Sequence, residues 1–380
     1  MKGALNGLRV LDLGQWIAAP YCTAILADFG AEVIKIEKTQ GGDDQRHSSP
    51  FVDGQSAFFN LFNRNKRSVA LDLTTEDGRQ QCRDLIRTAD ILVENYRPGA
   101  MARMGLDYAA ASRLNPGLIY CSISGFGQTG PMRKEGGFDL VIQAMSGLAS
   151  LCGPAAEQAH RLPIPLVDVS TALFATIGIL TAVTARNHTG KGQYIDIALL
   201  DSALAMAPLE VAHYLATGCN PERLGQASRN AAPYQLFSTQ DGSLALGAAA
   251  QHLWEKTCDV IGAPELKDDP RFRTNALRIQ HCAELATLIE QRLVHHPSAY
   301  WLDRLAAAGI PAGPVLTYRE ILNHPQVAAR QLIRSPEQDA GHPPTMINPI
   351  RLSDTPARLI SGAPDLGAHN AQLLPSAPTA

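Results

Sequence analysis

The sequence predicts a doubly wound α/β fold, with a mostly parallel sheet, for residues 1 to about 200. The first observation is a strand–helix–strand unit at the start of the chain. Residues 8–13 are typical of a strand. Residues 18–29 are typical of a helix that Gly30 ends, and residues 31–37 of a second strand. Such a βαβ unit has parallel strands and a right-handed crossover.

The second observation is that this pattern repeats. Short apolar runs, rich in branched residues, alternate with helical patterns, and Thr75 is a good N-cap for one of the helices. The further predicted elements are strands at residues 68–73, 91–95, 118–124 and 193–197, and helices at residues 76–88 and 199–215.

The third observation is a change of pattern near Pro233. Two strands flank the turn Asp241-Gly242, and separate helices follow, which is typical of an α+β domain. These strands are expected at residues 234–239 and 243–246, and the helices at residues 251–261, 283–293 and 299–308. The predicted organisation is a large domain at residues 1–200, a connector helix at 201–225, a small α+β domain at 226–322, and a return segment at 323–380 that packs on the large domain.

Composition argues against several classes of protein. A net charge of -3 over 380 residues gives no basic footprint for nucleic acids. The seven cysteines are scattered without metal-ligand spacing, which fits a reducing compartment. The amino terminus lacks the apolar core of a signal peptide, and the longest uncharged apolar run, residues 172–185, is shorter than the roughly 20 residues that span a bilayer. We expect a soluble, cytoplasmic protein without a metal site.

One aspartate is a candidate reactive group. Two prolines hold its approach extended, and Ser170 and Thr171 are good caps for an apolar helix at residues 172–185. Such a helix is expected to be buried on every side. Asp168 then lies at the mouth of this helix, where the helix dipole favours its ionised form. A simple capping role would also explain an aspartate at this position.

Two loops and several cations are candidates for ligand binding. The turn at residues 14–20 lacks the G-x-G-x-x-G pattern of dinucleotide-binding enzymes, although its small residues let a ligand approach the backbone. The glycine-rich loop at residues 125–131 is either a tight loop near the ligand or an ordinary connection. Basic residues at strand ends are each typical of surface charge, but together they can bind phosphates: Lys38, residues 64–67, Arg97 and Arg103.

With these residues in view, the chain resembles the class III CoA-transferase family, which includes formyl-CoA transferase, carnitine CoA-transferase and the 2-methylacyl-CoA racemases. The resemblance runs nearly end to end, in order. It implies a large Rossmann-like domain that binds coenzyme A, a smaller domain, and an interlocked homodimer. The matching pieces are residues 8–20, 26–37, 65–68, 94–99 and 124–131, Asp168 with its helix, and residues 232–234, 269–272 and 308–315.

The resemblance also implies where coenzyme A binds. Lys38 would contact a phosphate as a point charge. The other contacts implied by the family pattern are Gln15, Ile17, Ala18, Leu71, Asp72, Leu73, Asn95, Tyr96, Arg97, Arg103, Gly136, Gly137 and Phe138. No metal, flavin or nicotinamide is implied.

One position separates the two chemistries of the family. Racemases of this type carry a histidine immediately before an aspartate, and that histidine exchanges the α-proton with the counterpart of Asp168. Here Phe138 precedes Asp139, and a phenylalanine transfers no proton. The resemblance therefore favours a transferase over the alternative, an acyl-CoA racemase or epimerase. A non-catalytic CoA-binding protein is the third reading.

The resemblance implies a mechanism in which Asp168 attacks an acyl-CoA and carries CoA as an aspartyl thioester. Succinyl-CoA is the expected donor and a small carboxylic acid the expected acceptor. We expect neither a nucleic acid nor a membrane as a partner. Backbone N–H groups of the loop at residues 125–130 and of the helix start near Asp168 are candidate oxyanion donors. Asp139 is equally consistent with an orienting role and with a capping role. The segment 247–251 lacks the long glycine string of formyl-CoA transferase, which argues against formate.

Overall fold

The structure is a computed structural model that describes residues 3–154, 156–338 and 342–374. The chain divides into two units, each with its own apolar core. The first unit contains the described residues up to Ala149, Arg161–Cys219 and those from Pro325 onward, and the second contains the described residues of Ser150–His160 and Asn220–His324.

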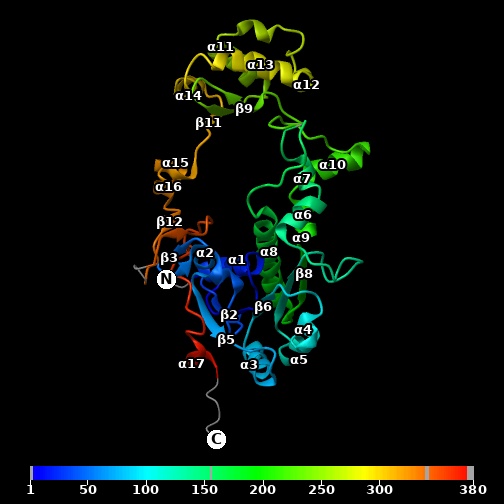
Figure 1. The fold of residues 1–380 in the computed structure, drawn as a ribbon, viewed down its shortest axis with the longest axis vertical. Helices are drawn as coiled ribbons and strands as arrows, with labels where there is room; N and C mark the ends of the chain where they lie inside the picture. The colour runs from blue at the N-terminus through cyan, green and yellow to red at the C-terminus, as the bar shows by residue number, and fades with distance from the viewer. Residues whose placement is uncertain (1–2, 155, 339–341, 375–380) are drawn as a thin grey trace. The chain divides into compact units, whose positions relative to one another are not determined.

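Six parallel strands form the central sheet of the first unit, in the order β5-β2-β1-β6-β7-β8 (Figure 1). The chain starts in the middle of this sheet, builds outward to β5, and then returns to the other side of β1. This is the doubly wound arrangement, and the predicted α/β class with a large parallel sheet is confirmed. The strands are β1 (Arg9–Asp12), β2 (Glu32–Glu37), β5 (Lys66–Ala70), β6 (Ile91–Glu94), β7 (Ile119–Ser124) and β8 (Tyr194–Ala198).

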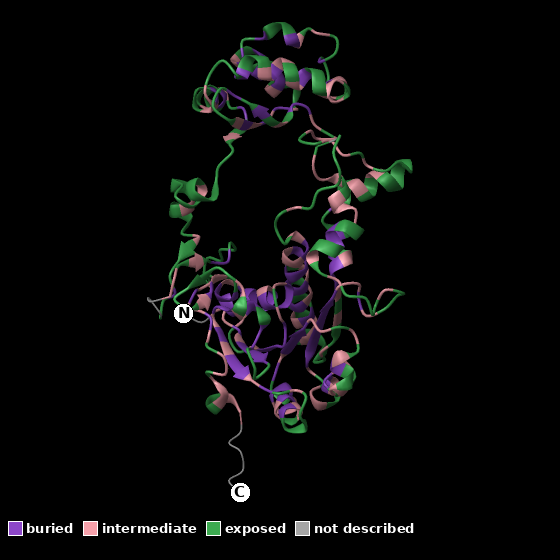
Figure 2. Ribbon diagram, viewed as in Figure 1, coloured by how far each residue is buried: buried purple, intermediate pink, exposed green. Residues whose placement is uncertain are grey.

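Helices cover both faces of the sheet, so strands β2, β6 and β7 are buried on both sides, whereas β8 at the edge is partly exposed (Figure 2). Val10 packs toward one face and Leu11 toward the other, as the alternation of side chains along a strand requires. One face carries α1 (Ala18–Asp28), α6 (Asp139–Met145), α8 (Leu166–Thr189) and α9 (Leu199–Ala205), and the other carries α3 (Glu76–Arg87), α4 (Ala100–Arg103) and α5 (Tyr108–Leu114).

Short elements complete the first unit. Near the carboxyl terminus, the backbone pairs with the start of β5, because Asn65 Nδ2 donates to the Arg358 carbonyl over 2.8 Å and its Oδ1 accepts from the Ile360 N–H over 2.7 Å. Parts of the predicted return segment, residues 339–341 and 375–380, lie outside the described residues. The short elements are η1 (Asp44–His47), β3 (Phe51–Val52), β4 (Gln55–Ser56), α2 (Ala57–Asn63), α7 (Leu148–Leu151, at the boundary between the units), α10 (Pro208–Thr217), α16 (Pro325–Arg330), β12 (Ile333–Arg334), β13 (Thr345–Met346) and α17 (Asn370–Leu373).

The second unit has a three-stranded antiparallel sheet in the order β11-β10-β9. Trp254, Phe272 and Trp301 are buried in its core. Its elements are β9 (Tyr234–Ser238), β10 (Ser243–Gly247), α11 (Gln251–Val260), η2 (Pro264–Lys267), α12 (Asn275–Gln280), α13 (Cys282–Leu293), α14 (Ser298–Ala307), β11 (Ala312–Pro314) and α15 (Tyr318–Leu322).

Helix α8 corrects two predictions. It begins at Leu166, so Ser170 and Thr171 lie inside the helix and do not cap it. It is also not buried on every side, since Ile177 is 59% exposed and Leu173 and Leu180 are exposed as well. The whole helix is long and apolar enough to cross a membrane, with 44% of its most apolar window buried in the protein. The length argument based on residues 172–185 was therefore wrong.

Two further boundaries differ from the prediction. The helical stretch at residues 199–215 is broken between α9 and α10, because Pro208 lacks an N–H and cannot continue a helix. Strand β5 begins at Lys66, earlier than expected. This charged residue can lie in a buried strand because its ion pair with Asp12 compensates the charge.

Candidate active site

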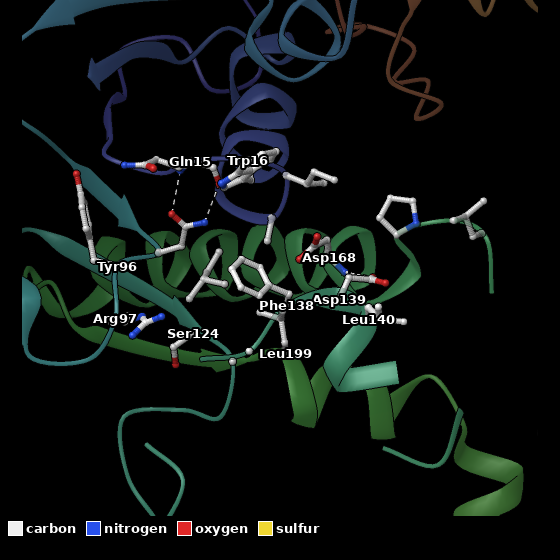
Figure 3. Close-up of a pocket in the computed structure, with 18 of the residues that line it drawn as sticks. Gln15, Trp16, Tyr96, Arg97, Ser124, Phe138, Asp139, Leu140, Asp168 and Leu199 are labelled. Atoms are coloured by element: carbon white, nitrogen blue, oxygen red, sulfur yellow. Dashed lines mark hydrogen bonds between the residues drawn. The ribbon is translucent and has the colours of Figure 1, made fainter. Parts of the chain in front are cut away.

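A cavity of about 650 Å³ opens at the carboxyl ends of β1 and β6, the two strands at the centre of the sheet. The connections leaving these strands run to opposite sides, so the loops separate and leave a crevice. The turn after β1 contributes Gln15, Trp16 and Ile17, and the loop after β6 contributes Asn95 to Arg97 (Figure 3). The site therefore lies where doubly wound sheets bind their ligands.

The two loops hold each other in place. The Gln15 N–H donates to Asn95 Oδ1 over 2.9 Å, and Asn95 Nδ2 donates to the Gln15 carbonyl over 2.8 Å (Figure 3). Trp16 has a positive φ of 65°, which is rare for a bulky residue, and its N–H donates to Asp43 Oδ1 over 3.3 Å. A backbone in this strained state needs support from its surroundings.

Buried ion pairs beneath the turn give that support. Lys66 Nζ lies 2.8 Å from Asp12 Oδ2, and Asp12 Oδ1 accepts from the Gly14 N–H over 2.8 Å. Lys35 Nζ donates to the Gly14 carbonyl over 2.9 Å and pairs with Asp43 over 2.9 Å. Removing one partner would leave a buried charge uncompensated. The network thus fixes the backbone of the turn on which the cavity depends.

Asp139, at the start of α6, caps helix α8. Its Oδ2 accepts from the Val167 N–H over 2.8 Å and from the Asp168 N–H over 3.2 Å. Gln143 Nε2 donates to Asp139 Oδ1 over 2.5 Å and so orients the carboxylate. Because the Val167 and Asp168 N–H groups already donate to Asp139, they are not available as oxyanion donors, and that prediction was wrong. In the glycine-rich loop, Gly125 lines the cavity.

The Asp168 side chain points into the cavity beside Asp139 (Figure 3). Among the described residues, no donor is paired with its carboxylate oxygens. Burial raises the pKa of Asp168 to about 7, and the charge of Asp139 adds to the increase. The prediction that the helix dipole favours the ionised form was wrong, because the first N–H groups of the helix serve Asp139. A desolvated carboxylate without hydrogen bonds is a stronger nucleophile than a solvated one once it is ionised.

The structure brings part of the predicted coenzyme-binding set into this cavity and leaves the rest outside it. Leu71 is buried in the core, Asp72 is exposed and bonds to Thr74, and Lys38 pairs with Asp44 over 2.5 Å. The predicted residues that line the cavity are Gln15, Ile17, Ala18, Asn95, Tyr96, Arg97, Gly137 and Phe138, with Asp168. Those that do not line it are Lys38, Leu71, Asp72, Leu73, Arg103 and Gly136.

The basic run at residues 64–67 does not form a phosphate site. Arg64 is buried and pairs with Asp28 over 2.6 Å, and Arg67 pairs with Glu32 over 2.8 Å. With Lys66 held by Asp12, each of these cations is already neutralised by a carboxylate. The hypothesis that this run helps to hold phosphates was therefore wrong.

Several lining residues were not found from the sequence. Trp16 depends on an unusual φ, and Leu140 and Leu199 resemble ordinary helix residues. Arg161 lies in the segment before Asp168, in which the prolines are the residues that predict an extended backbone. The signal that could have found Arg161 is a lone cation close in sequence to a candidate nucleophile. Among the described residues lining this cavity there is no histidine, and 68% of Phe138 is exposed.

Comparisons with known sequences and structures identify relatives of this chain. The sequence matches the family model described as CoA-transferase family III over residues 5–370. It is 40% identical over 375 residues to acetyl-CoA:oxalate CoA-transferase of Acetobacter aceti, covering 98% of this chain and 95% of that protein. It is 38% identical over 381 residues to succinate–glutarate CoA-transferase of Agrobacterium fabrum, with coverage of 98% and 95%. A crystal structure of a CAIB/BAIF family protein from Brucella suis matches with a TM-score of 0.88 and 38% identity, covering 98% of both chains.

Proposed function

The chain belongs to CoA-transferase family III and is an enzyme of CoA transfer, and we propose that it moves coenzyme A from an acyl-CoA donor to a dicarboxylic acid through an aspartyl-CoA thioester on Asp168. The observation that carries this proposal is the Asp168 carboxylate. It faces the cavity at the carboxyl ends of the two central strands and has no donor among the described residues. Such a group is available to a substrate carbonyl.

The proposed reaction consists of two matched halves. A carboxylate oxygen of Asp168 attacks the acyl carbon of the donor, the C–S bond breaks, and a mixed anhydride and the CoA thiolate result. The thiolate attacks the aspartyl carbon, which releases the donor acid with one oxygen from Asp168. The acceptor carboxylate then attacks the aspartyl thioester, and the same steps in reverse give the new acyl-CoA and restore Asp168. Proximity and exclusion of water supply most of the rate acceleration.

The substrate class is inferred from the names of two relatives. The names of these relatives specify oxalate and glutarate, and each of these acids carries two carboxylates. We propose a dicarboxylic acceptor, with succinyl-CoA as donor. Coenzyme A would run past the loops after β1 and β6, and Lys38, Asp72, Leu73, Arg103 and Gly136 would bind the parts of it that extend beyond the cavity. The Leu71 side chain is buried in the core and is not available to it.

Racemisation remains the less favoured alternative. It requires a second proton-transferring group across the α-carbon from Asp168. The family resemblance assigns the position of that group to Phe138, which lines the cavity and transfers no proton. Deuterium incorporation at the α-carbon of a chiral acyl-CoA in heavy water, without an acceptor acid, would favour racemisation over transfer.

A CoA-exchange assay tests the proposed function. We expect purified protein incubated with succinyl-CoA and a panel of dicarboxylic acids to form the corresponding new acyl-CoA, with free succinate released in equal amount. Mass spectrometry of the thioesters gives both quantities. Hydrolysis of succinyl-CoA without a new thioester, for every acid in the panel, would contradict the proposal.

We also propose that the protein is a homodimer, as the family resemblance implies. The support is an exposed apolar strip on α8, formed by Leu173, Ile177 and Leu180, since contiguous exposed apolar surface is typical of interfaces. We expect Ile177→Asp to shift the mass measured by light scattering from dimer toward monomer, because the interface would bury an unpaired charge. Asn187→Asp, at the exposed end of the same helix, should leave the mass unchanged. A dimer of unaltered stability in the Ile177 variant would contradict the assignment of this surface.

A further inference from the structure

Arg161 places an unpaired guanidinium at the cavity that holds Asp168. Its side chain is exposed, and it makes no hydrogen bond or ion pair with any residue that the structure describes. Other arginines of the same unit, such as Arg46 and Arg64, are paired with carboxylates. An unpaired cation beside a reactive site is available to bind an anion of the substrate.

Side chains of helix α6 hold both the backbone next to Arg161 and the backbone of Asp168. The Leu162 N–H donates to Gln143 Oε1 over 2.9 Å, and Gln143 Nε2 donates to the Ile164 carbonyl over 3.2 Å. Asp139, on the same helix α6, holds the Asp168 N–H. The segment between Arg161 and Asp168 is therefore pinned to α6 at both ends, which fixes the root of the arginine relative to the nucleophile.

The negative charge in the cavity favours a cation as the partner of a second substrate carboxylate. Asp139 contributes negative charge beside Asp168 throughout the reaction, and this charge repels the second carboxylate of a dicarboxylic ligand. Arg97 is the other cation that lines the cavity, and it lies after β6, beside Tyr96 and Ser124 (Figure 3), where we place coenzyme A. Arg161 is left for the acyl part of the substrate.

From this arrangement we infer that Arg161 binds the distal carboxylate of a dicarboxylic acid while the other carboxylate reacts at Asp168; this inference rests on the proposed function. The guanidinium fork matches a carboxylate in two parallel hydrogen bonds. Ile164, Leu140 and Leu199 line the cavity with apolar surface that suits the methylene groups between the two carboxylates. Arg161 would then select dicarboxylic acids over monocarboxylic acids of equal length.

The test compares two acceptors that differ in charge and hardly at all in shape: glutarate and its half-amide, 5-amino-5-oxopentanoate. With one donor throughout, the ratio of their kcat/KM values cancels any effect of a variant on the donor half-reaction. We expect the wild-type enzyme to prefer glutarate by about 10- to 150-fold, the value of a hydrogen bond to a charged group. Arg161→Gln should bring the ratio close to one, and Arg161→Lys should retain part of the preference.

Arg113→Gln is the matched control, because Arg113 is also exposed but lies on α5, away from the cavity. Both glutamine variants should keep the wild-type melting temperature. An unchanged ratio in Arg161→Gln, or a wild-type enzyme that accepts both acids equally, would overturn the inference while CoA transfer itself stands. Transfer by the wild-type enzyme to no acid at all would overturn the proposed function and the inference together.

Discussion

Replacing Asp168 with asparagine is expected to lower kcat for CoA transfer by about 10⁴-fold or more, the scale seen when a covalent nucleophile is removed. Asparagine has nearly the same shape but cannot form the anhydride. Because the carboxylate has no donor among the described residues, the substitution breaks no hydrogen bond that holds the fold. Steady-state assays of thioester exchange measure the loss, and calorimetry should show that CoA still binds.

A control and a label make this result specific to Asp168. Asp201→Asn changes an exposed aspartate in the first turn of α9, outside the cavity, and should transfer CoA at the wild-type rate. When the acceptor carries ¹⁸O in its carboxylates, one labelled oxygen should enter the Asp168 carboxylate in each turnover, and peptide mass spectrometry detects it. Near-wild-type turnover by Asp168→Asn, or an unlabelled Asp168 after many turnovers, would exclude this residue as the nucleophile.

Local signals were enough to predict the elements that depend on local interactions. The βαβ unit of β1, α1 and β2 was visible because its strands are apolar and Gly30, with a positive φ of 95°, ends the helix. Thr75 caps α3 as predicted, since its side chain accepts from the Gly78 N–H three residues ahead. In these cases the stabilising partner is a near neighbour in sequence.

Elements held by distant partners were misjudged. Helix α8 begins earlier than predicted because its cap, Asp139, comes from another helix, so the local candidates Ser170 and Thr171 are not needed. Strand β5 was predicted too late because nothing near Lys66 in sequence indicates that its charge is neutralised by Asp12. The candidate site follows the same rule. Asp168 was found from its sequence context, whereas the partnership with Asp139 appears only when α6 and α8 pack together.

The pH dependence of transfer is the second large expected effect. The nucleophile must be ionised, and burial raises the pKa of Asp168 to about 7, far above the value near 4 of a free aspartate. The value of kcat/KM should therefore reach its plateau above about pH 7 and fall tenfold per unit below it, a loss of about 100-fold at pH 5. Asp139→Asn, which removes the neighbouring charge while its amide oxygen still accepts from the helix start, should move the midpoint to lower pH.

The raised pKa of Asp168 also affects stability. A rise in pH increases the activity but lowers the free energy of unfolding. Between about pH 4 and pH 7 the folded protein holds a proton on Asp168 that the unfolded chain has released, so the free energy of unfolding decreases as the pH rises through this range. Asp168→Asn carries no charge, and its melting temperature should exceed that of the wild type at pH 8 and equal it at pH 4. Calorimetric melting curves at the two pH values check this. A kcat/KM midpoint near pH 4, together with equal melting temperatures of the wild type and Asp168→Asn at pH 8, would contradict this account. The Asp168 carboxylate would then be solvated, and neither burial nor the charge of Asp139 would govern its ionisation.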